Sequence, residues 1–507
     1  MRVVFVTCGL EHLGVEALAA WLRRHGHDPV VVYEPRPFSS GSGTDQAHLA
    51  RWLEPTPEET AARVVAARPD VVAFTSYSVT HRWAVAVARE VKRARRVPVV
   101  FGGPHAGALP ERVILEPSID AVVEGEGEGA LLDLVECAEA DGFGRTDVPN
   151  VTFKGRLVPR RNPVRPLIQD LDELPFADKR GFYGEVPALE REFYVMSRRG
   201  CPYRCSFCEY STFPEQYPGE KPVRRRSVGN LVAEMLSWKA RGRVRKVFFW
   251  DAIFTLDLRW MEEFAGRWRR EVGLPFECYT HPQTMTRDMA RLLAEAGCIM
   301  VRVGVQSVNA DTLAAMDRRG DQARVQQTLA ALTEYGVPYS LDHIVGLPGE
   351  TARDQLDALR FYNEVRPRRI VAHWMTYFPG TTALRRARAE GLLSDADVER
   401  ISDGDVGPGY MFGGNAPAPA LSEIAQLSGV FDLLPLLPPE AIAWMLEGGR
   451  YRHLRARGLL RQLSVAALAL RGDEATREHA RQVFASVFSA TSDALQRAVR
   501  RRVSPPA

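Results

Sequence analysis

Arg199-Gly200-Cys201-Pro202-Tyr203-Arg204-Cys205-Ser206-Phe207-Cys208 is the stretch from which the rest of this chain can be interpreted. Its three thiolates lie on one short loop and can hold three irons of a 4Fe-4S cluster, which leaves the fourth iron open to a substrate. The spacing differs from the four-cysteine ferredoxin run and from paired C-x-x-C zinc sites, and no Cys or His follows nearby to complete a zinc tetrahedron. The alternatives are a zinc loop or three unrelated cysteines.

The composition is that of a soluble globular protein. The chain has 507 residues, of which 45% are hydrophobic and 25% charged, a length that suits roughly two to four domains. Lys and Arg number 66 against 63 acidic residues, so the charge balance favours neither nucleic acid nor an anionic membrane as a partner. No apolar stretch reaches the roughly 20 residues of a membrane helix, and residues 1–10 run into Glu11 and His12 instead of a long apolar signal core.

Cysteine usage points to a cytoplasmic protein. Three of the seven cysteines lie in one motif, so they do not form a disulfide framework, and an oxidising compartment would threaten a cluster. We expect Cys8, Cys137, Cys278 and Cys298 to be ordinary core thiols.

Residues 1–140 alternate short apolar runs with helical patterns, which predicts a doubly wound parallel sheet and an α/β fold. The expected strands are 2–7, 29–33, 71–75, 97–101 and 121–124, with helices over 13–25 and 79–95. Ligands of such sheets bind beyond the carboxyl ends of the strands, where glycines allow close approach and hydroxyl groups can hydrogen-bond. Gly-Gly pairs also occur in simple turns. The strand-end residues are Ser76, Tyr77, Ser78, Gly102, Gly103, Pro104, His105, Gly125, Glu126 and Gly127.

A second alternation predicts an open (β/α)6 barrel over residues 191–400. The expected strands are 194–197, 247–250, 276–279, 300–304, 339–344 and 370–376, and the helices are 228–241, 259–272, 286–296, 310–317, 321–335 and 352–364. Pro149, Pro159, Pro163, Pro166, Pro175 and Pro187 interrupt residues 141–190 and predict a linker between the two domains.

The C-terminal region, residues 401–507, is expected to be mostly helical and to pack on the barrel. Residues 404–419 are rich in Gly and Pro and predict a loop that closes over the substrate. Helical patterns follow over 421–434, 439–446, 450–470 and 476–499.

The cysteine stretch resembles the signature of the radical S-adenosylmethionine (SAM) enzymes, in which the open iron chelates the amino and carboxylate groups of SAM. The resemblance implies that Cys201, Cys205 and Cys208 bind the 4Fe-4S cluster. Asp251 ends the second barrel strand and would accept a hydrogen bond from the SAM ammonium group, with a helix cap as the alternative. Gln306 stands where the family often has Glu, so only an amide contact is expected there. The SAM-binding residues implied are Phe207, Asp251, Arg302, Gln306, Ile344 and Gly346.

The Gly-Gly-Pro-His loop after the fourth strand and the Gly-Glu-Gly-Glu loop after the fifth, upstream of the cysteines, resemble the cobalamin-dependent radical SAM enzymes over roughly residues 1–400. The resemblance implies that the strand-end residues named above, together with His12, bind cobalamin. Glu11-His12-Leu13-Gly14 is similar to a D-x-H-x-x-G loop whose His ligates cobalt, but His12 is one residue too close to Gly14. Tyr77 and Ser78 are better placed by this analogy to face the lower side of the corrin, where filling space is favoured over coordination.

The resemblance implies a methyltransferase. A one-electron reductase of the flavodoxin or ferredoxin type reduces the cluster, SAM is cleaved, and the substrate radical takes a methyl group from methylcobalamin. The expected substrate is a small specialised metabolite from natural product biosynthesis, methylated on an unactivated carbon or less often on phosphorus. The alternatives are an enzyme that uses cobalamin for cyclisation or rearrangement, and a non-catalytic cobalamin or cluster sensor. No motif identifies the substrate or a catalytic residue.

Overall fold

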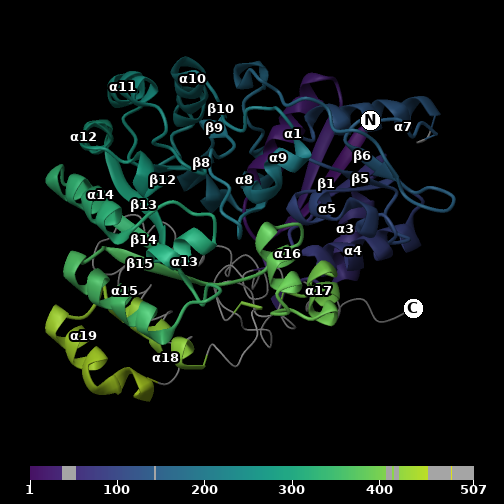
Figure 1. The fold of residues 1–507 in the computed structure, drawn as a ribbon. Helices are drawn as coiled ribbons and strands as arrows, with labels where there is room; N and C mark the ends of the chain where they lie inside the picture. Colours follow the sequence, from purple (N-terminus) through teal and green to yellow (C-terminus); the bar gives the residue numbers. More distant parts are fainter. Residues whose placement is uncertain are drawn as a thin grey trace.

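Two sheets, each built mainly of parallel strands, lie side by side in the computed structural model (Figure 1). The structure describes residues 1–36, 53–141, 144–406, 414–415 and 422–454, together with residues 467 and 481. The N-terminal sheet is drawn in purple and blue and the second sheet in teal and green. The expected α/β fold is confirmed.

The N-terminal sheet has the strand order β2-β1-β3-β4-β5-β6-β7. The five expected strands are present as β1 (Arg2–Cys8), β2 (Asp28–Glu34), β3 (Val71–Thr75), β4 (Val99–Gly102) and β5 (Ala121–Val123), and all five run parallel. β6 (Val151–Phe153) and β7 (Arg160–Arg161) extend the sheet in antiparallel sense. Both come from residues 141–190, so the segment expected to be a linker begins as part of this sheet.

Helices cover both faces of the N-terminal sheet because its side chains alternate between the faces. Val3 and Phe5 of β1 share a core with α1 and α7, whereas Val4 and Val6 share a core with α3 and α4. The helices are α1 (Leu13–Arg24), α3 (Pro57–Ala66), α4 (His81–Ala94), α5 (Pro104–Ala108), α6 (Pro110–Val113) and α7 (Glu128–Asp141).

The second sheet has six parallel strands in the order β15-β14-β13-β12-β11-β8. The strands are β8 (Glu192–Val195), β11 (Lys246–Phe249), β12 (Phe276–Thr280), β13 (Cys298–Gln306), β14 (Tyr339–Val345) and β15 (Arg369–Trp374). The helices are α10 (Val228–Lys239), α11 (Leu258–Arg267), α12 (Arg287–Ala296), α13 (Ala310–Ala315), α14 (Gln322–Glu334) and α15 (Ala352–Val365). β8 and β15 do not pair in the part of the chain described, so the (β/α)6 barrel is open, as expected.

The interior of the barrel is more accessible than its outer face. In β13 and β14, Arg302 and Asp342 are partly exposed, whereas the alternate residues Val301, Val303 and Leu341 are buried under the helices. Since outward-facing residues of a strand alternate with inward-facing ones, Arg302 and Asp342 face the interior of the barrel.

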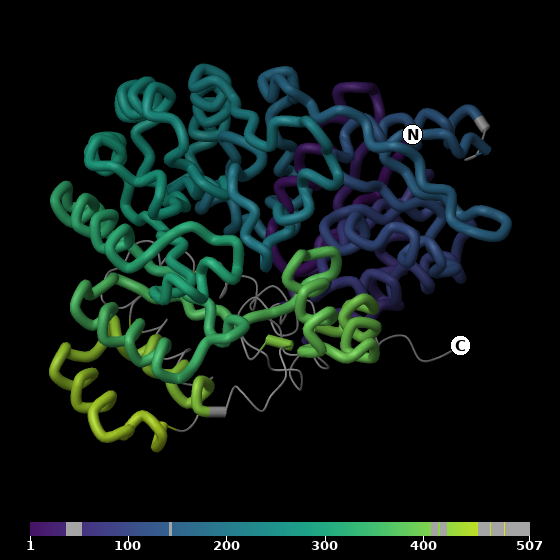
Figure 2. The backbone as a smooth tube through the Cα atoms, in the orientation of Figure 1, coloured from purple at the N-terminus to yellow at the C-terminus, as the bar shows by residue number. Residues whose placement is uncertain are grey.

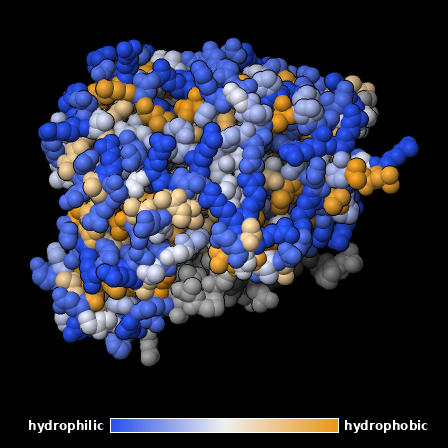
Figure 3. Space-filling model, in the orientation of Figure 1, coloured by the Kyte–Doolittle hydropathy of each residue, from blue (hydrophilic) through white to orange (hydrophobic). Residues whose placement is uncertain are grey.

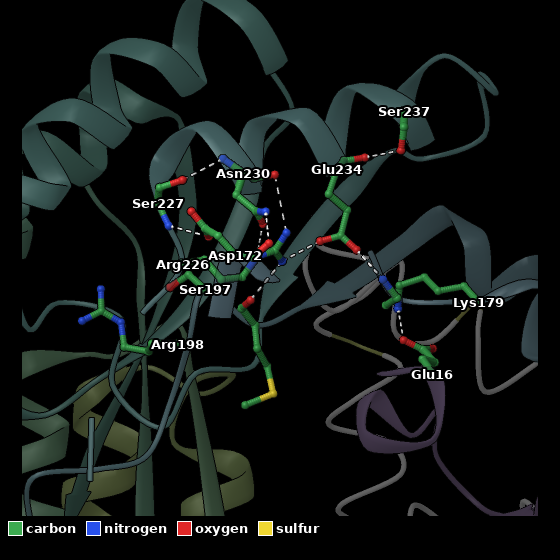
Figure 4. A network of polar contacts seen from close by, with 12 residues as sticks. Glu16, Asp172, Lys179, Ser197, Arg198, Arg226, Ser227, Asn230, Glu234 and Ser237 are labelled. Carbon is green, nitrogen blue, oxygen red and sulfur yellow. Dashed lines mark hydrogen bonds and ion pairs between the residues drawn. The ribbon is translucent and has the colours of Figure 1, made fainter. Parts of the chain in front are cut away.

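Residues 164–191 tie the two sheets together through buried polar contacts (Figure 4). Lys179 donates from Nζ to Glu11 Oε1 at 2.7 Å and to Glu16 Oε2 at 2.6 Å, and all three side chains are fully buried. On the barrel side, Glu234 of α10 accepts a hydrogen bond from the amide of Ala177 at 3.0 Å. The segment also contains α8 (Arg180–Glu185) and two 3-10 turns, Leu171–Glu173 and Pro187–Arg191.

Two helices after the barrel were not expected from the sequence: α16 (Thr382–Ala389) and α17 (Asp395–Ser402). They lie against the N-terminal domain (Figure 2), where Arg112 donates to Glu399 at 2.6 Å and to Asp403 at 2.7 Å. α18 (Ser422–Leu433) and α19 (Pro439–Leu446) confirm two expected helices, and both pack on α15. A 3-10 segment, Glu447–His453, follows. Most of the helices predicted over 450–470 and 476–499, and of the loop over 404–419, falls outside the described residues.

The face of the molecule seen in Figure 3 is mostly hydrophilic, with apolar residues in small separate groups. None of the described helices combines the length and the hydrophobicity that a membrane crossing needs.

Candidate functional site

The cysteine loop lies between the two strands of a short antiparallel hairpin, β9 (Arg198–Arg199) and β10 (Arg224–Arg225). Gly200 joins β9 to the loop with φ +91°, and a Cβ atom there would lie 1.7 Å from the carbonyl oxygen of Pro222. Only glycine fits that position. Within the loop the amide of Cys208 donates to the carbonyl of Cys205 at 2.9 Å, a turn that folds the motif back on itself. The 3-10 turn Glu209–Thr212 and α9 (Phe213–Gln216) follow.

The chemistry of the three free thiols fits a metal cluster. Burial raises the pKa of Cys201, and it raises the pKa of Cys208 to about 12. Iron removes this cost because coordination deprotonates a thiol outright. Arg318 Nη1 donates to Cys205 Sγ at 3.4 Å. Three thiolates on one loop are the ligand set of a 4Fe-4S cluster that keeps one iron open.

The ends of β12 and β13 reach the cysteine loop. The ring of Tyr203 stacks on His281, which follows β12, with centroids 4.2 Å apart. Arg318, which lies beyond α13, also donates to the carbonyl oxygen of Gly304 in β13. Arg318 therefore links Cys205 to the strand end where Gln306 lies.

Gln306 has a left-handed backbone with φ +69°, and the pairing of β13 with β14 shifts register between Gly304 and Gln306. A non-glycine residue in this region is strained, and such strain clusters at functional sites. A Cβ atom built on Gly304 would lie 3.2 Å from Gln306 Nε2 and 3.4 Å from Arg318 Nη2. Gln306 thus lies beside the Arg318 that contacts Cys205, and its amide contact with SAM stays a prediction.

Asp251 anchors the backbone that leads into the cysteine loop. Its Oδ1 accepts from the amides of Ser197 at 3.0 Å and Arg198 at 2.6 Å, and from the Ser197 hydroxyl at 3.1 Å. The side chain is fully buried, and burial raises the pKa of Asp251 to about 6 although Arg198 opposes the rise. The cap of α11 is Asp257, not Asp251. In this structure Asp251 accepts its hydrogen bonds from Ser197 and Arg198. Its contact with the SAM amino group therefore stays a prediction.

The end of β14 is held by a buried glutamate. Glu350 accepts from the amides of Gly346 and Leu347 at 3.1 Å each and from the Ser307 hydroxyl at 3.1 Å. Burial raises the pKa of Glu350 to about 7. Gly346 has φ +79°. Two other predicted SAM residues, Phe207 and Ile344, pack against one apolar cluster that includes Leu347 and Met316, so the structure brings them together.

Arg302 lies deeper in the barrel than the strand ends. Its Nη2 pairs with Glu277 at 3.1 Å and its Nη1 donates to the Tyr279 hydroxyl at 3.3 Å. Glu277 also pairs with Lys246 at 2.5 Å, and Lys246 with Glu192 at 2.6 Å. Acidic and basic side chains thus alternate across β8, β11, β12 and β13, and they fill the lower part of the barrel. The predicted contact of Arg302 with SAM remains a prediction.

The loops after β3 and β4 form one buried polar site in the N-terminal domain. The Ser76 hydroxyl hydrogen-bonds His81 Nδ1 at 2.8 Å and the Ser78 hydroxyl hydrogen-bonds His105 Nδ1 at 2.9 Å. The two imidazoles stack with centroids 4.1 Å apart. Burial lowers the pKa of His81 to about 4 and that of His105 to about 3. The structure therefore brings three predicted cobalamin residues together and adds His81.

Gly102, Gly103 and Pro104 lead into this site at the start of α5. Gly103 has φ +91°, and a Cβ atom there would lie 2.9 Å from both the Ser76 amide nitrogen and Thr75 Oγ1. Gly103 and Pro104 are exposed. The backbone at this strand end is therefore accessible to a bulky ligand such as cobalamin, which fits the predicted role.

His12 and Tyr77 meet at the ends of β1 and β3, with ring centroids 5.1 Å apart. His12 is buried, hydrogen-bonds the carbonyl of Cys8 through Nε2 at 3.2 Å, and has its pKa lowered by burial to about 4. The Tyr77 side chain is 39% exposed. Neither the cobalt-ligand role of His12 nor the corrin contact of Tyr77 is tested by this arrangement.

Gly125 and Glu126 face the barrel, whereas a Cβ atom on Gly127 would lie 3.3 Å from Leu18 of α1. The Glu126 carboxylate accepts from Arg199 Nη1 at 3.0 Å and from Arg224 Nη1 at 2.7 Å. Both arginines belong to the hairpin that carries the cysteine loop. The predicted cobalamin contact of the Gly-Glu-Gly loop stays a prediction. The contacts that Glu126 makes in this structure are with the cysteine hairpin.

The cobalamin-side loops and the cysteine loop share neighbours. Val79 in the loop after β3 and Phe207 in the cysteine loop pack against the same apolar cluster, which includes Met316 and Leu347. The amide of Ala383 in α16 donates to the carbonyl of Ser206 at 2.9 Å. Beyond α17, a Cβ atom on Gly404 would lie 2.9 Å from that of His81. α16 and α17 therefore contact both loops.

Sequence reasoning missed Arg318, Glu350, His281 and His81. His281 follows the predicted strand 276–279 and His81 follows 71–75, so the strand-end rule could have found both. Glu350 follows β14 as closely as His81 follows β3, so the same rule could have found it, whereas Arg318 lies beyond α13 and only the fold shows its contacts.

Comparisons with known protein families agree with this arrangement. Residues 2–135 match the B12 binding domain and residues 195–362 match the Radical SAM superfamily. These two domains define the class: a radical SAM enzyme that carries a cobalamin-binding domain. The chain belongs to the cobalamin-dependent radical SAM enzymes, whose cofactors are a 4Fe-4S cluster, SAM and cobalamin.

Among three relatives, two are named methyltransferases and one a cyclase. An uncharacterised methyltransferase of Pyrococcus horikoshii is 28% identical over 64% of this chain and 71% of its own length. The cobalamin-dependent radical SAM methyltransferase TokK of Streptomyces tokunonensis is 28% identical over 57% of this chain and 44% of its own length. An anaerobic magnesium-protoporphyrin IX monomethyl ester cyclase of Rubrivivax gelatinosus is 25% identical over 75% of this chain and 68% of its own length.

One solved structure covers nearly the whole fold. TsrM, a radical SAM methyltransferase from Kitasatospora setae with cobalamin and the 4Fe-4S cluster bound, has a TM-score of 0.65 at 18% identity. The likeness covers 92% of this chain and 99% of that chain. It shows that the fold is shared.

Proposed function

We propose that this protein transfers a methyl group from SAM, by way of cobalamin, to an unactivated carbon of a small specialised metabolite. The observation that carries the proposal is the meeting of the two sites: Val79 in the loop after β3 and Phe207 in the cysteine loop pack against the same apolar cluster. When bound, the cluster supplies the electron that cleaves SAM and cobalamin supplies the methyl group. The protein positions these groups and excludes water.

The side chains that face the barrel interior support a small molecule as the methyl acceptor. The partly accessible lining of the barrel combines aromatic side chains, such as Tyr279 and the 37% exposed Trp250, with the charged groups Arg302 and Asp342. Burial raises the pKa of Asp342 to about 6, although Arg302 and Arg369 oppose the rise. Mostly apolar walls with a few polar groups are typical of small-molecule sites.

An anaerobic assay tests the proposal. Reconstituted protein with SAM and a one-electron reductant should form 5′-deoxyadenosine and S-adenosylhomocysteine. A Cys201→Ala, Cys205→Ala, Cys208→Ala variant should lose 5′-deoxyadenosine formation and the iron–sulfur absorbance, and it should keep its cobalamin. Cleavage of SAM by that variant would refute the cluster assignment. A sensor without catalysis would form no 5′-deoxyadenosine.

Cyclisation or rearrangement without methyl transfer is the second candidate. The sequence similarity to the cyclase of Rubrivivax gelatinosus favours it. The two reactions differ in their products. Methyl transfer yields S-adenosylhomocysteine with 5′-deoxyadenosine and makes the substrate one methylene heavier, whereas a cyclase makes no S-adenosylhomocysteine. A cytoplasmic location and a flavodoxin- or ferredoxin-type electron donor are part of the proposal.

A further inference from the structure

The loop after β5 holds the root of the cysteine loop through four charged residues, which we call the latch: Glu126, Glu128, Arg199 and Arg224. Arg199 Nη1 donates to Glu126 at 3.0 Å and its Nη2 donates to Glu128 at 2.5 Å. Arg224 donates to the same Glu126 oxygen at 2.7 Å. Glu126 therefore joins both strands of the hairpin, and Arg199 lies two residues before Cys201.

The latch is shielded from water. The Glu128 and Arg224 side chains are only 4% and 6% exposed. Burial alone would raise the pKa of Glu126, but Arg199 and Arg224 hold it below its usual value. A partly buried, charge-assisted contact is stronger and more directional than an exposed ion pair. The latch therefore fixes the hairpin relative to β5.

The backbone of the β5 loop sits directly on the barrel. A Cβ atom on Gly125 would lie 1.7 Å from the Tyr217 hydroxyl oxygen, and that hydroxyl accepts from the Glu126 amide at 3.2 Å. Tyr217 follows the cysteine loop and α9. Since no side chain larger than hydrogen fits at Gly125, the loop is shaped to receive the segment that carries the cysteines.

The same loop also adjoins the cobalamin-side glycines. A Cβ atom on Gly107 in α5 would lie 3.8 Å from the Glu124 Cα and 3.9 Å from the Gly125 nitrogen. α5 begins directly after Gly103. One short segment, residues 124–128, thus contacts the helix of the Gly-Gly-Pro-His loop on one side and the cysteine hairpin on the other.

We propose that the latch couples cobalamin binding to the geometry of the cluster loop, so that each cofactor strengthens the binding of the other. Glu126, Glu128 and Arg199 are positioning residues in this scheme, since they act through the backbone of the two loops. Coupling between two sites is reciprocal, and it commonly amounts to a 5- to 150-fold change in affinity. The inference rests on the proposed function, because it needs both cofactors to bind.

Hydroxocobalamin affinity tests the coupling without any measurement of turnover. Its dissociation constant is measured by equilibrium dialysis for cluster-free and cluster-reconstituted full-length protein. The natural protein should bind hydroxocobalamin more tightly with the cluster present, by a factor on the order of 5- to 150-fold. In the Glu126→Gln, Glu128→Gln variant this ratio should fall to about one, with both cofactors still bound. The electron paramagnetic resonance signal of the reduced cluster should respond to hydroxocobalamin in the natural protein and not in the variant.

A matched control is Glu185→Gln, which removes a carboxylate from an ion pair outside the latch. In that pair Arg63 Nη2 lies 2.9 Å from Glu185 Oε1, and the Glu185 side chain is 38% exposed. That variant should keep the natural ratio. A ratio of one in the natural protein, or an unchanged ratio in the double variant, overturns the inference, and the first of these needs no variant to fold. A natural protein that retains no cobalamin or no cluster would instead refute the proposed function.

Discussion

Two adjacent glycines of the Gly-Gly-Pro-His loop have different structural requirements. A Cβ atom on Gly103 would clash with the Ser76 backbone at φ +91°, whereas one on Gly102 would lie 3.8 Å from Val123, an ordinary contact. Gly103→Ala should therefore destabilise the protein by about 1–3 kcal/mol or more, because φ 91° with ψ 176° is a region that is essentially restricted to glycine. Gly102→Ala should change stability by less than about 0.5 kcal/mol. Thermal unfolding of the two variants checks both values.

Measuring the cobalt content of Gly102→Ala distinguishes an effect on cobalamin binding from an effect on folding. If Gly102 faces the corrin as predicted, Gly102→Ala should retain less cobalamin although it folds normally. Normal cobalt content in this variant would move the corrin away from the end of β4.

Among the elements, the strands and the barrel helices were predictable because burial gives them a clear period. The strand-like runs 71–75 and 276–279 appear as β3 and β12, and the helix starts carry side-chain caps such as Ser227 and Thr351. β7, with only Arg160 and Arg161, has no hydrophobic pattern and was missed.

The site was predictable where a motif is local and not where it depends on tertiary contacts. The cysteines are close in sequence and were found. Arg318 donates to a sulfur 113 residues away, and Glu126 pairs with arginines 73 and 98 residues away. No spacing rule covers such contacts, so the Gly-Glu-Gly-Glu motif suggested cobalamin alone.

Two buried histidines in the loops after β3 and β4 lead us to expect that the protein loses stability in acid. Burial lowers the pKa of His81 to about 4 and that of His105 to about 3, below the ordinary 6.5. The unfolded chain therefore binds protons first as pH falls, so stability is full above pH 6.5 and is lost towards pH 4. The loss at pH 5 is about 2 kcal/mol for each histidine.

His81→Gln keeps a polar group beside Ser76 and removes the titration. The difference in urea stability between pH 7 and pH 5 should shrink by about 2 kcal/mol relative to the natural protein. His25→Gln, at an exposed histidine, should leave that difference unchanged. An unaltered pH dependence in His81→Gln would mean that His81 is already protonated in the folded state.

At the scale of the whole molecule, one hydrophobic core continues from the N-terminal domain into the barrel. Val3 of β1, Phe182 of α8 and Phe193 of β8 belong to the same buried cluster. The segment between the sheets is therefore packed structure. Such continuity holds the strand ends of both sheets in a fixed relation, which a reaction between two cofactors requires.

The buried triad of Lys179, Glu11 and Glu16 joins the segment between the sheets to the N-terminal domain. Removing its positive charge measures how much this contact contributes to the stability of the protein. Lys179→Met leaves two buried carboxylates without a cation, which should cost about 3–5 kcal/mol in urea unfolding. Burial already raises the pKa of Glu16 well above its usual value, so protonation should relieve the deficit, and the deficit should narrow as pH falls.

The matched variant Lys179→Met, Glu11→Gln, Glu16→Gln removes all three charges and should recover most of that loss, because a neutral replacement leaves no buried charge unpaired. The Lys179 ammonium also lies 4.6 Å from the centre of the Phe193 ring, a contact that both variants remove. If the triple variant were as unstable as Lys179→Met alone, this contact and the packing of the lysine stem would hold the domains together, and charge would not.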